Sequence, residues 1–152
     1  HRNLNYFNEI KDYIKKNGLS NNYKYLGVVA YKDAMSLMFH SIAIINPSKF
    51  EGWSSSVEQA KSMGKKIILS NINVHREQNP KRGIYFNPNN YNKLTSIMIN
   101  IWKNYNKKDE NKFNKIAYKN LKPRLIAYAR NYQKIILKSA QSRTFKVNSI
   151  NK

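Results

Sequence analysis

The sequence contains no cysteine, few acidic residues and no long apolar run. Without cysteine, the chain can form neither a disulfide nor a metal site built on thiolates. Its three histidines, His1, His40 and His75, lie too far apart in sequence to indicate a zinc cluster, so we expect a structural or solvated role for each. The longest apolar stretches, such as residues 42–45, are far too short to span a membrane. The sequence therefore predicts no metal ion and no membrane-spanning helix.

The charge of the chain is strongly one-sided. Eight Asp and Glu stand against 28 Lys and Arg, which gives a net charge of +20. Residues 101–152 contain 14 of the basic residues and two of the acidic ones, so the excess is concentrated in the last third of the chain. Two interpretations stay open. The lysines can form a solvated basic surface, or they can attract anions such as nucleotide phosphates, anionic lipid or nucleic acid.

Helical and strand-like patterns alternate along the first hundred residues. Short apolar runs and turn residues predict strands over residues 23–29, 41–46, 66–70 and 83–86. Helical spacing predicts helices over residues 8–17, 33–39, 54–63, 91–106, 109–121 and 123–142. Such alternation predicts an α/β fold, with a Rossmann-like parallel sheet that has helices on both faces, followed by C-terminal helices. We expect residues 1–122 to form one incomplete domain and residues 123–152 a C-terminal crossover helix with a basic tail.

The most informative stretch follows the second predicted strand. Open parallel sheets bind ligands beyond the carboxyl ends of their strands, and here the strand over residues 41–46 leads through Glu51 to three consecutive serines, Ser54–Ser56, at a helix start. Free amides at a helix N-terminus attract phosphate, whereas a carboxylate accepts hydrogen bonds from sugar hydroxyls. The pattern therefore suits a ligand with both groups. It is equally typical of an ordinary serine cap with an acid that stabilises the helix dipole.

Residues 47–60 resemble the signature of family 4 glycosyltransferases, in which a Pro-Ser-x-x-Glu-Gly turn leads into a helix with a second glutamate. The similarity continues through the blocks at residues 61–70, 74–77 and 83–88, and it includes residues 26–28 and 35–39 upstream. It covers roughly residues 2–100. The resemblance implies the nucleotide-sugar-binding, C-terminal half of a retaining enzyme of the GT-B type, which needs no metal ion. The absence of an Asp-x-Asp motif agrees with this.

The resemblance also implies roles for individual residues. Glu51 is the acid that contacts the hydroxyls of the donor sugar, and we expect it to be catalytic. The loop and helix start that follow hold the sugar or the diphosphate; they comprise Gly52, Trp53, Ser54, Ser55 and Ser56. The family's second acid, which binds the ribose, is replaced here by Gln59, with Glu58 just before it. Candidates for the pocket of the nucleotide base are Gly27, Val28, Val29 and Tyr31.

Partners follow from the same resemblance. The donor is expected to be a UDP- or GDP-linked sugar, and no cofactor is expected. The chain begins with His1 rather than with methionine, so we expect it to belong to a longer enzyme whose N-terminal half binds a glycan or lipid-linked acceptor. A cytoplasmic location is expected, with peripheral contact to an anionic membrane at its inner face.

Two other interpretations stay open. Gln59 in place of an acid suits a non-catalytic, degenerate homologue that still binds nucleotide sugars. The basic charge, with aromatic residues among lysines at residues 102–105 and 113–118, is also found in nucleic-acid-binding modules. We expect no nucleic-acid partner, because helices normally bury such aromatic residues and no recognition motif is present.

Overall fold

The computed structural model describes residues 4–150, with side chains up to residue 141. The chain divides into two compact units, His1–Ala34 and Met35–Lys152. In the first unit, α1 (Leu4–Lys16) is followed by a turn at Gly18, which has a φ of +66°, and then by an exposed loop. Helix α2 (Tyr31–His40) begins in this unit and ends in the second.

The strand predicted over residues 23–29 is wrong, because this segment is an exposed loop without regular structure. The segment is rich in Tyr and Val, which favour strands, but a strand also needs the hydrogen bonds of a neighbour. Gly27 breaks the extended conformation with a φ of +66°. Tyr25 packs its ring on Phe7 of α1, with 4.8 Å between the ring centroids.

The second unit is built on a parallel sheet of three strands in the order β1-β2-β3. The strands are β1 (Ile44–Asn46), β2 (Ile67–Ser70) and β3 (Gly83–Phe86), and they confirm the three remaining predicted strands within a few residues. Ile68 at the centre of β2 lies opposite Ile45 on β1 and Ile84 on β3. All four residues of β2 are buried, as expected for a central parallel strand with both faces covered.

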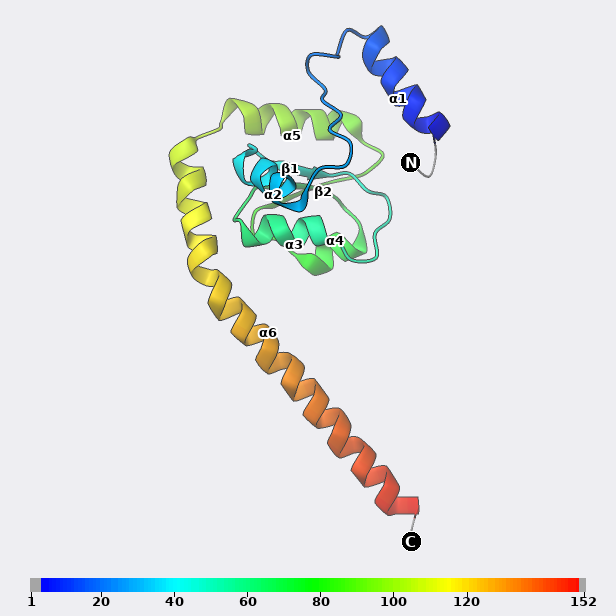
Figure 1. The fold of residues 1–152 in the computed structure, drawn as a ribbon, viewed down its shortest axis with the longest axis vertical. Helices are drawn as coiled ribbons and strands as arrows, with labels where there is room; N and C mark the ends of the chain where they lie inside the picture. Colours follow the sequence, from blue (N-terminus) through cyan, green and yellow to red (C-terminus); the bar gives the residue numbers. More distant parts are fainter. Residues whose placement is uncertain (1–3, 151–152) are drawn as a thin grey trace. The chain divides into compact units, whose positions relative to one another are not determined.

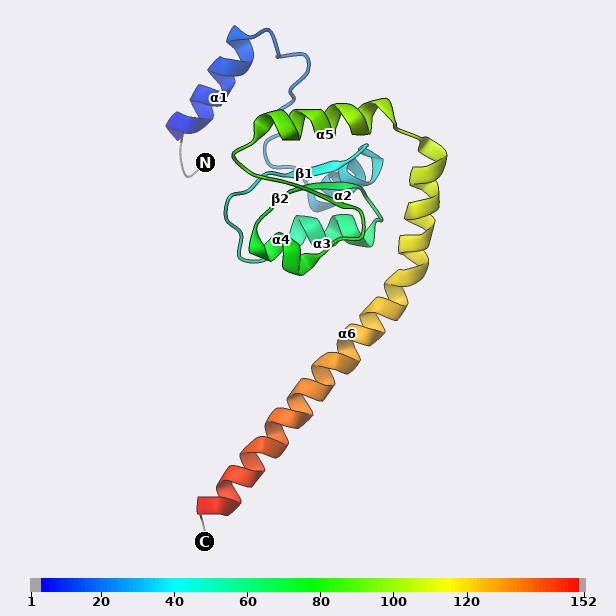
Figure 2. The same ribbon diagram turned by 180° about the vertical axis from the view of Figure 1, so that it is seen from behind.

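Helices cover both faces of this sheet, as predicted (Figure 1). Helices α3 (Ser55–Ser62) and α4 (Asn73–Gln78) lie on one side, and α5 (Tyr91–Lys103) lies on the other; the view from behind shows the same order (Figure 2). Successive residues of β2 pack on opposite faces of the sheet. Ile67 and Leu69 pack with Val57 and Ala60 of α3, while Ile68 packs with the α5 side. The six-residue helix α4 was not predicted.

The C-terminal part is one helix, α6 (Lys107–Ile150), rather than the two predicted helices. Pro123 lies inside it. Proline is favoured at helix starts, which motivated the predicted break. Within a helix it removes a backbone hydrogen bond and crowds the preceding turn, yet here the helix continues through it. The domain boundary predicted between residues 122 and 123 falls inside α6 and stays a prediction. Within residues 4–150, no helix is long and apolar enough to cross a membrane.

Candidate functional site

The loop after β1 is organised by the side chain of Asn46, the last residue of that strand. This buried amide donates from Nδ2 to Glu51 Oε1 at 3.1 Å and to Ser54 Oγ at 2.9 Å. Its Oδ1 accepts from the backbone N–H of Ser48 at 3.2 Å. One side chain thus fixes the turn, the acid and the start of α3. Asn46 was not predicted as a site residue; the available signal was a polar residue at the end of an otherwise apolar strand.

Glu51 presents an ionised carboxylate. Its Oε1 accepts from Asn46 Nδ2 and also from Ser48 Oγ, at 2.8 Å. These two hydrogen bonds lower the pKa of Glu51 below its ordinary value, and the nearby His75 lowers it further. Burial raises the pKa but does not outweigh these contacts. Within residues 4–141, Oε2 of Glu51 makes no hydrogen bond. The site therefore offers a fixed, charged acceptor with one oxygen available.

The start of α3 has no side-chain cap. Ser54 occupies the N-cap position, with φ −84° and ψ 105°, but its hydroxyl makes no capping hydrogen bond. Asn46 and Ser56 hold that hydroxyl instead, and Oγ of Ser54 and Ser56 are 3.0 Å apart. The interpretation of Ser54 as an ordinary capping residue is therefore wrong. No side chain caps the first-turn amides of α3, so these N–H groups can bind an anion.

The remaining predicted residues of this loop line its exposed side. Gly52 and Ser55 are exposed, Trp53 has 56% of its surface exposed, and Ser56 is half-buried. The structure thus brings Glu51 and the start of α3 together around Asn46, and Trp53 is open to a ligand.

Glu58 is engaged in contacts of its own. Its Oε1 accepts from Lys61 Nζ at 2.9 Å and from Gln78 Nε2 at 3.1 Å, and its Oε2 lies 3.9 Å from Arg124 of α6. These partners connect α3 with α4 and α6. Gln59 is half-buried and makes no side-chain hydrogen bond within residues 4–141. Since Glu58 is already paired, we do not expect it to replace Gln59 at a ribose.

Two buried residues of α4, Gln78 and His75, hydrogen-bond to backbone carbonyls close to this loop in the fold. Gln78 Nε2 donates to the carbonyl of Ser54 at 2.8 Å, which fixes the first turn of α3. The ring of His75 is fully buried, and its Nδ1 lies 2.9 Å from the carbonyl of Ser70, to which it donates because a carbonyl can only accept. Neither residue was predicted as part of the site. Both follow β2 in the chain, and Gln78 contacts the start of α3 directly.

The four residues proposed for the base pocket belong to the first unit. Val28 is fully exposed, Tyr31 has 69% of its surface exposed, and Gly27 and Val29 lie in the same exposed loop. Their contact with a nucleotide base stays a prediction. Among the described residues, no group of three or more His, Asp or Glu side chains is placed to hold a metal ion.

Comparison with known proteins agrees with this architecture. A family model described as glycosyl transferases group 1 matches residues 3–120 of the 152. A search of the curated proteins found no match, and a search of the solved structures found none. The matched region contains the three-stranded parallel sheet, its covering helices and the loop of Glu51. The chain therefore belongs to the group 1 glycosyltransferases, and it corresponds to the C-terminal, Rossmann-like domain of their GT-B fold.

Proposed function

We propose that this chain binds a UDP- or GDP-linked sugar at the loop that follows β1. One observation carries the proposal: Asn46 and Ser48 hold the ionised Glu51 carboxylate at Oε1, while Oε2 has no hydrogen bond among residues 4–141. Sugar hydroxyls donate strongly to such a charged acceptor. The uncapped start of α3 follows directly in the chain and suits the diphosphate, because a helix N-terminus attracts anions.

In the proposed reaction, the sugar is transferred with retention to a glycan or lipid-linked acceptor, in the synthesis of a cell-surface polysaccharide. Glu51 orients the sugar through its hydroxyls. The first-turn amides of α3 stabilise the negative charge that develops on the departing diphosphate. Gly27, Val28, Val29 and Tyr31 are proposed to contact the base. Gln59 is proposed to contact the ribose.

The acceptor is proposed to bind an N-terminal half of the same enzyme, across a cleft from residues 1–122, with residues 123–152 crossing between the halves. Correct placement of two reactants contributes roughly 7–11 kcal/mol to catalysis. We therefore expect the 152-residue chain to bind nucleotide but to transfer no sugar. We place the enzyme in the cytoplasm, in peripheral contact with an anionic membrane, as the basic excess supports.

A second candidate is a homologue that binds nucleotide sugars without turnover. Gln59 favours it, because a neutral amide binds ribose hydroxyls less strongly than a carboxylate does. A protein that contains both halves separates the candidates. Glycosyl transfer supports the enzyme, and nucleotide binding without transfer supports the degenerate homologue.

Thermal unfolding in the presence of nucleotides tests the proposed site directly. A UDP- or GDP-sugar, or the bare nucleotide, should stabilise the chain more than ATP does. At 100 times its dissociation constant, such a ligand adds about 2.7 kcal/mol relative to the ligand-free chain. Glu51→Gln should weaken the effect of the sugar nucleotide, whereas the exposed Glu77→Gln should not. In the enzyme with both halves, Glu51→Gln should lower kcat/KM about 10- to 100-fold. No stabilisation by any nucleoside diphosphate at millimolar concentration would reject the site.

A further inference from the structure

Helix α6 has a stripe of lysines on one side, which we call the lysine stripe. Its members recur at intervals of three and four residues and therefore share a helix face: Lys108, Lys112, Lys115, Lys119 and Lys122. At 1.5 Å per residue the stripe is about 21 Å long. All five side chains are exposed, and none forms an ion pair within the part of the chain that the structure describes.

The stretch of sequence that contains the stripe has only two acidic residues, Asp109 and Glu110, and only Asp109 is exposed. Glu110 is the last acidic residue in the chain, and eleven basic residues follow it. Glu110 itself is buried and paired with Arg82 at 2.6 Å. With Asp109 as its one exposed acid, the stripe is therefore a strongly positive surface that attracts anions.

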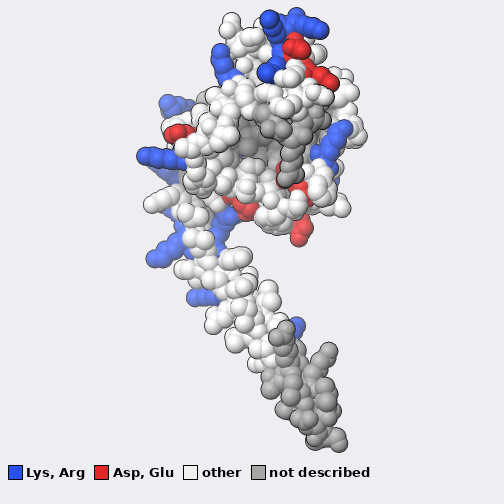
Figure 3. Space-filling view, turned by 45° about the vertical axis from the view of Figure 1, so that its right-hand side comes forward, with Lys and Arg blue, Asp and Glu red and all other residues white. Residues whose placement is uncertain are grey.

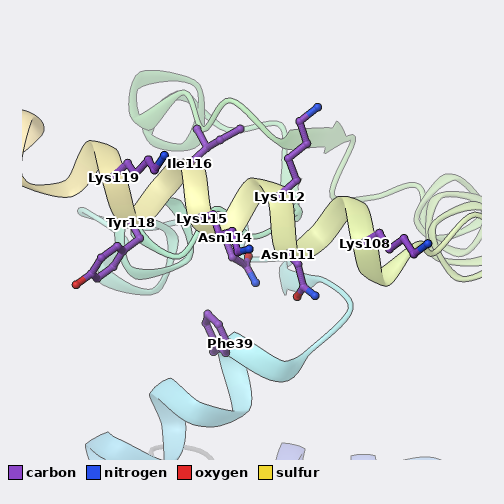
Figure 4. A pocket seen from close by; sticks show the side chains of 9 residues that line it. All are labelled: Phe39, Lys108, Asn111, Lys112, Asn114, Lys115, Ile116, Tyr118 and Lys119. Carbon is purple, nitrogen blue, oxygen red and sulfur yellow. The ribbon is translucent and has the colours of Figure 1, made fainter.

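An apolar groove runs beside the stripe. A cavity of about 680 Å³ lies between this part of α6 and Phe39 at the end of α2, and four of the five lysines line it (Figure 4). Phe39 and Ile116 contribute apolar surface, with exposed fractions of 43% and 45%. In Figure 4, Phe39 lies across from Asn111 and Asn114 of α6.

Buried charges fix the two walls of this groove. The buried Lys65 donates from Nζ to the carbonyls of Phe39 at 3.1 Å and Ser41 at 2.5 Å, which holds the end of α2. The same Nζ lies 3.9 Å from Glu110 in the first turn of α6. Since one side chain contacts both walls, the groove is part of the folded unit.

Farther along α6, apolar side chains are also exposed. Leu125, Tyr128, Tyr132 and Ile136 have between 50% and 70% of their surfaces exposed. Figure 3 shows blue side chains over the first part of α6 and a largely white surface beyond them. Lysines can contact lipid phosphates, and exposed Leu, Ile and Tyr can contact the apolar part of a membrane interface, so α6 offers both kinds of contact. Nucleic-acid sites favour arginine forks, whereas the stripe contains only lysine. One exposed aromatic ring, Tyr118, does line the groove and is able to stack on a base, so single-stranded RNA is the competing ligand in the test.

We propose that the lysine stripe and its groove bind an anionic phospholipid surface. The lysines contact the lipid phosphates, and Phe39 and Ile116 reach the apolar part of the interface. The proposal deepens the membrane contact assigned above and rests on it, but it needs no donor binding. A basic residue near an anionic membrane contributes about a fivefold gain in partitioning, so the stripe is sufficient for salt-dependent attachment.

Co-sedimentation with vesicles tests the proposal, with phosphatidylcholine alone compared with its mixture with phosphatidylglycerol. We expect binding to the mixture only, reduced by salt. The triple variant Lys112→Gln, Lys115→Gln, Lys119→Gln should lose about 100-fold in partitioning, from fivefold per lysine. The matched control Lys11→Gln, Lys15→Gln, Lys16→Gln on α1 removes the same charge and should lose less than about fivefold. Phe39→Ser should weaken the binding that remains at high salt.

Three results would overturn the assignment: equal binding to both vesicle types, equal losses in the two triple variants, or a higher affinity for single-stranded RNA than for the anionic vesicles. Thermal stabilisation by a UDP- or GDP-sugar is measured on the same variants and should be unchanged, because the stripe is separate from the loop of Glu51. Failure of vesicle binding with nucleotide stabilisation intact therefore rejects the lysine stripe and the membrane contact, and leaves the donor site standing. Failure of nucleotide stabilisation rejects the donor site alone.

Discussion

A hydrogen bond of 3.1 Å joins Asn46 Nδ2, at the end of β1, to Oε1 of Glu51 in the following turn. The same nitrogen binds Ser54 Oγ at 2.9 Å, so the acid and the start of α3 are positioned by one amide. The geometry of the proposed donor site thus depends on a residue that is itself buried and need not touch the sugar. Asn46 acts through Glu51 as a positioning residue.

Asn46→Ala should therefore weaken the donor site without removing any proposed ligand contact. It deletes one hydrogen bond to a charged group and one of the two partners of the buried Ser54 hydroxyl, which costs about 1.5–3 kcal/mol of unfolding free energy. We expect affinity for a nucleotide sugar to fall about tenfold while affinity for the bare nucleotide changes less. Calorimetric titration with both ligands measures the difference. Asn89→Ala, at an exposed asparagine, is the matched control, and equal losses for both ligands would contradict the positioning role.

The depressed pKa of Glu51 predicts how the site responds to acid. Because the folded-state pKa lies below the ordinary value of about 4.3, the native state binds this proton less readily than the unfolded chain. The stabilisation from the Glu51 carboxylate is thus complete above pH of about 4.3 and is lost as the pH falls through the folded value. Affinity for a nucleotide sugar should follow the same acid limb.

Ser48→Ala tests the cause of this pKa shift. It removes the donor 2.8 Å from Glu51 Oε1, so the pKa of Glu51 should rise toward its ordinary value. The carboxyl resonance of Glu51 in an NMR titration reports the change, and the acid limb of donor affinity should move up with it. An unchanged titration would mean that Asn46 alone sets the pKa.

The fold was predictable where its signals are local. Short apolar runs revealed β1, β2 and β3, because strands buried on both faces need apolar side chains throughout. The segment at residues 23–29 shows a similar pattern but finds no sheet neighbour in the structure, since strand pairing depends on distant parts of the chain. Helix α4 has only six residues and no capping side chain, so no periodic signal could reveal it.

The candidate site could likewise be predicted only in part from the sequence. Glu51 and the serines stand out because the turn and the resemblance place them together. Asn46 and Gln78 do not, because their contribution is a side-chain contact made only after folding. Gln78 lies 24 residues from Ser54, whose carbonyl it binds. The sequence gives no local sign of such a pairing.

Gln59→Glu should tighten nucleotide binding if residue 59 faces the ribose. A charged acceptor in place of a neutral one should add about 1 kcal/mol, or about fivefold in affinity. Glu58→Gln is the contrasting variant: it breaks contacts with Lys61 and Gln78, so it should lower stability without improving affinity. Calorimetric affinities of both variants for UDP and GDP test this prediction. Weaker binding by Gln59→Glu would show that this position requires a neutral side chain.

The stability of the second unit should depend strongly on Glu110. Burial raises the pKa of this carboxyl, but the hydrogen bonds and charge of Arg82, with Lys65 and Lys66, outweigh burial and hold the pKa below its ordinary value. Arg82 donates to both carboxylate oxygens, at 2.9 and 2.6 Å. Lys65 is buried, and that burial lowers its pKa, while the charge of Glu110 opposes the shift.

Glu110→Gln would leave these cations without their counter-charge in the interior. Removing one partner of a buried ion pair costs about 3–5 kcal/mol, and this loss should appear in denaturant unfolding of the whole chain. Asp109→Asn removes the same charge from the neighbouring, exposed position and should change stability by less than about 0.5 kcal/mol. Because Lys65 also holds the carbonyl of Phe39, Glu110→Gln should loosen the groove beside the lysine stripe and reduce binding to anionic vesicles. Equal stability of the two variants would mean that Lys65 and Arg82 are satisfied by their carbonyl contacts alone, and that α6 is anchored by packing rather than by this cluster.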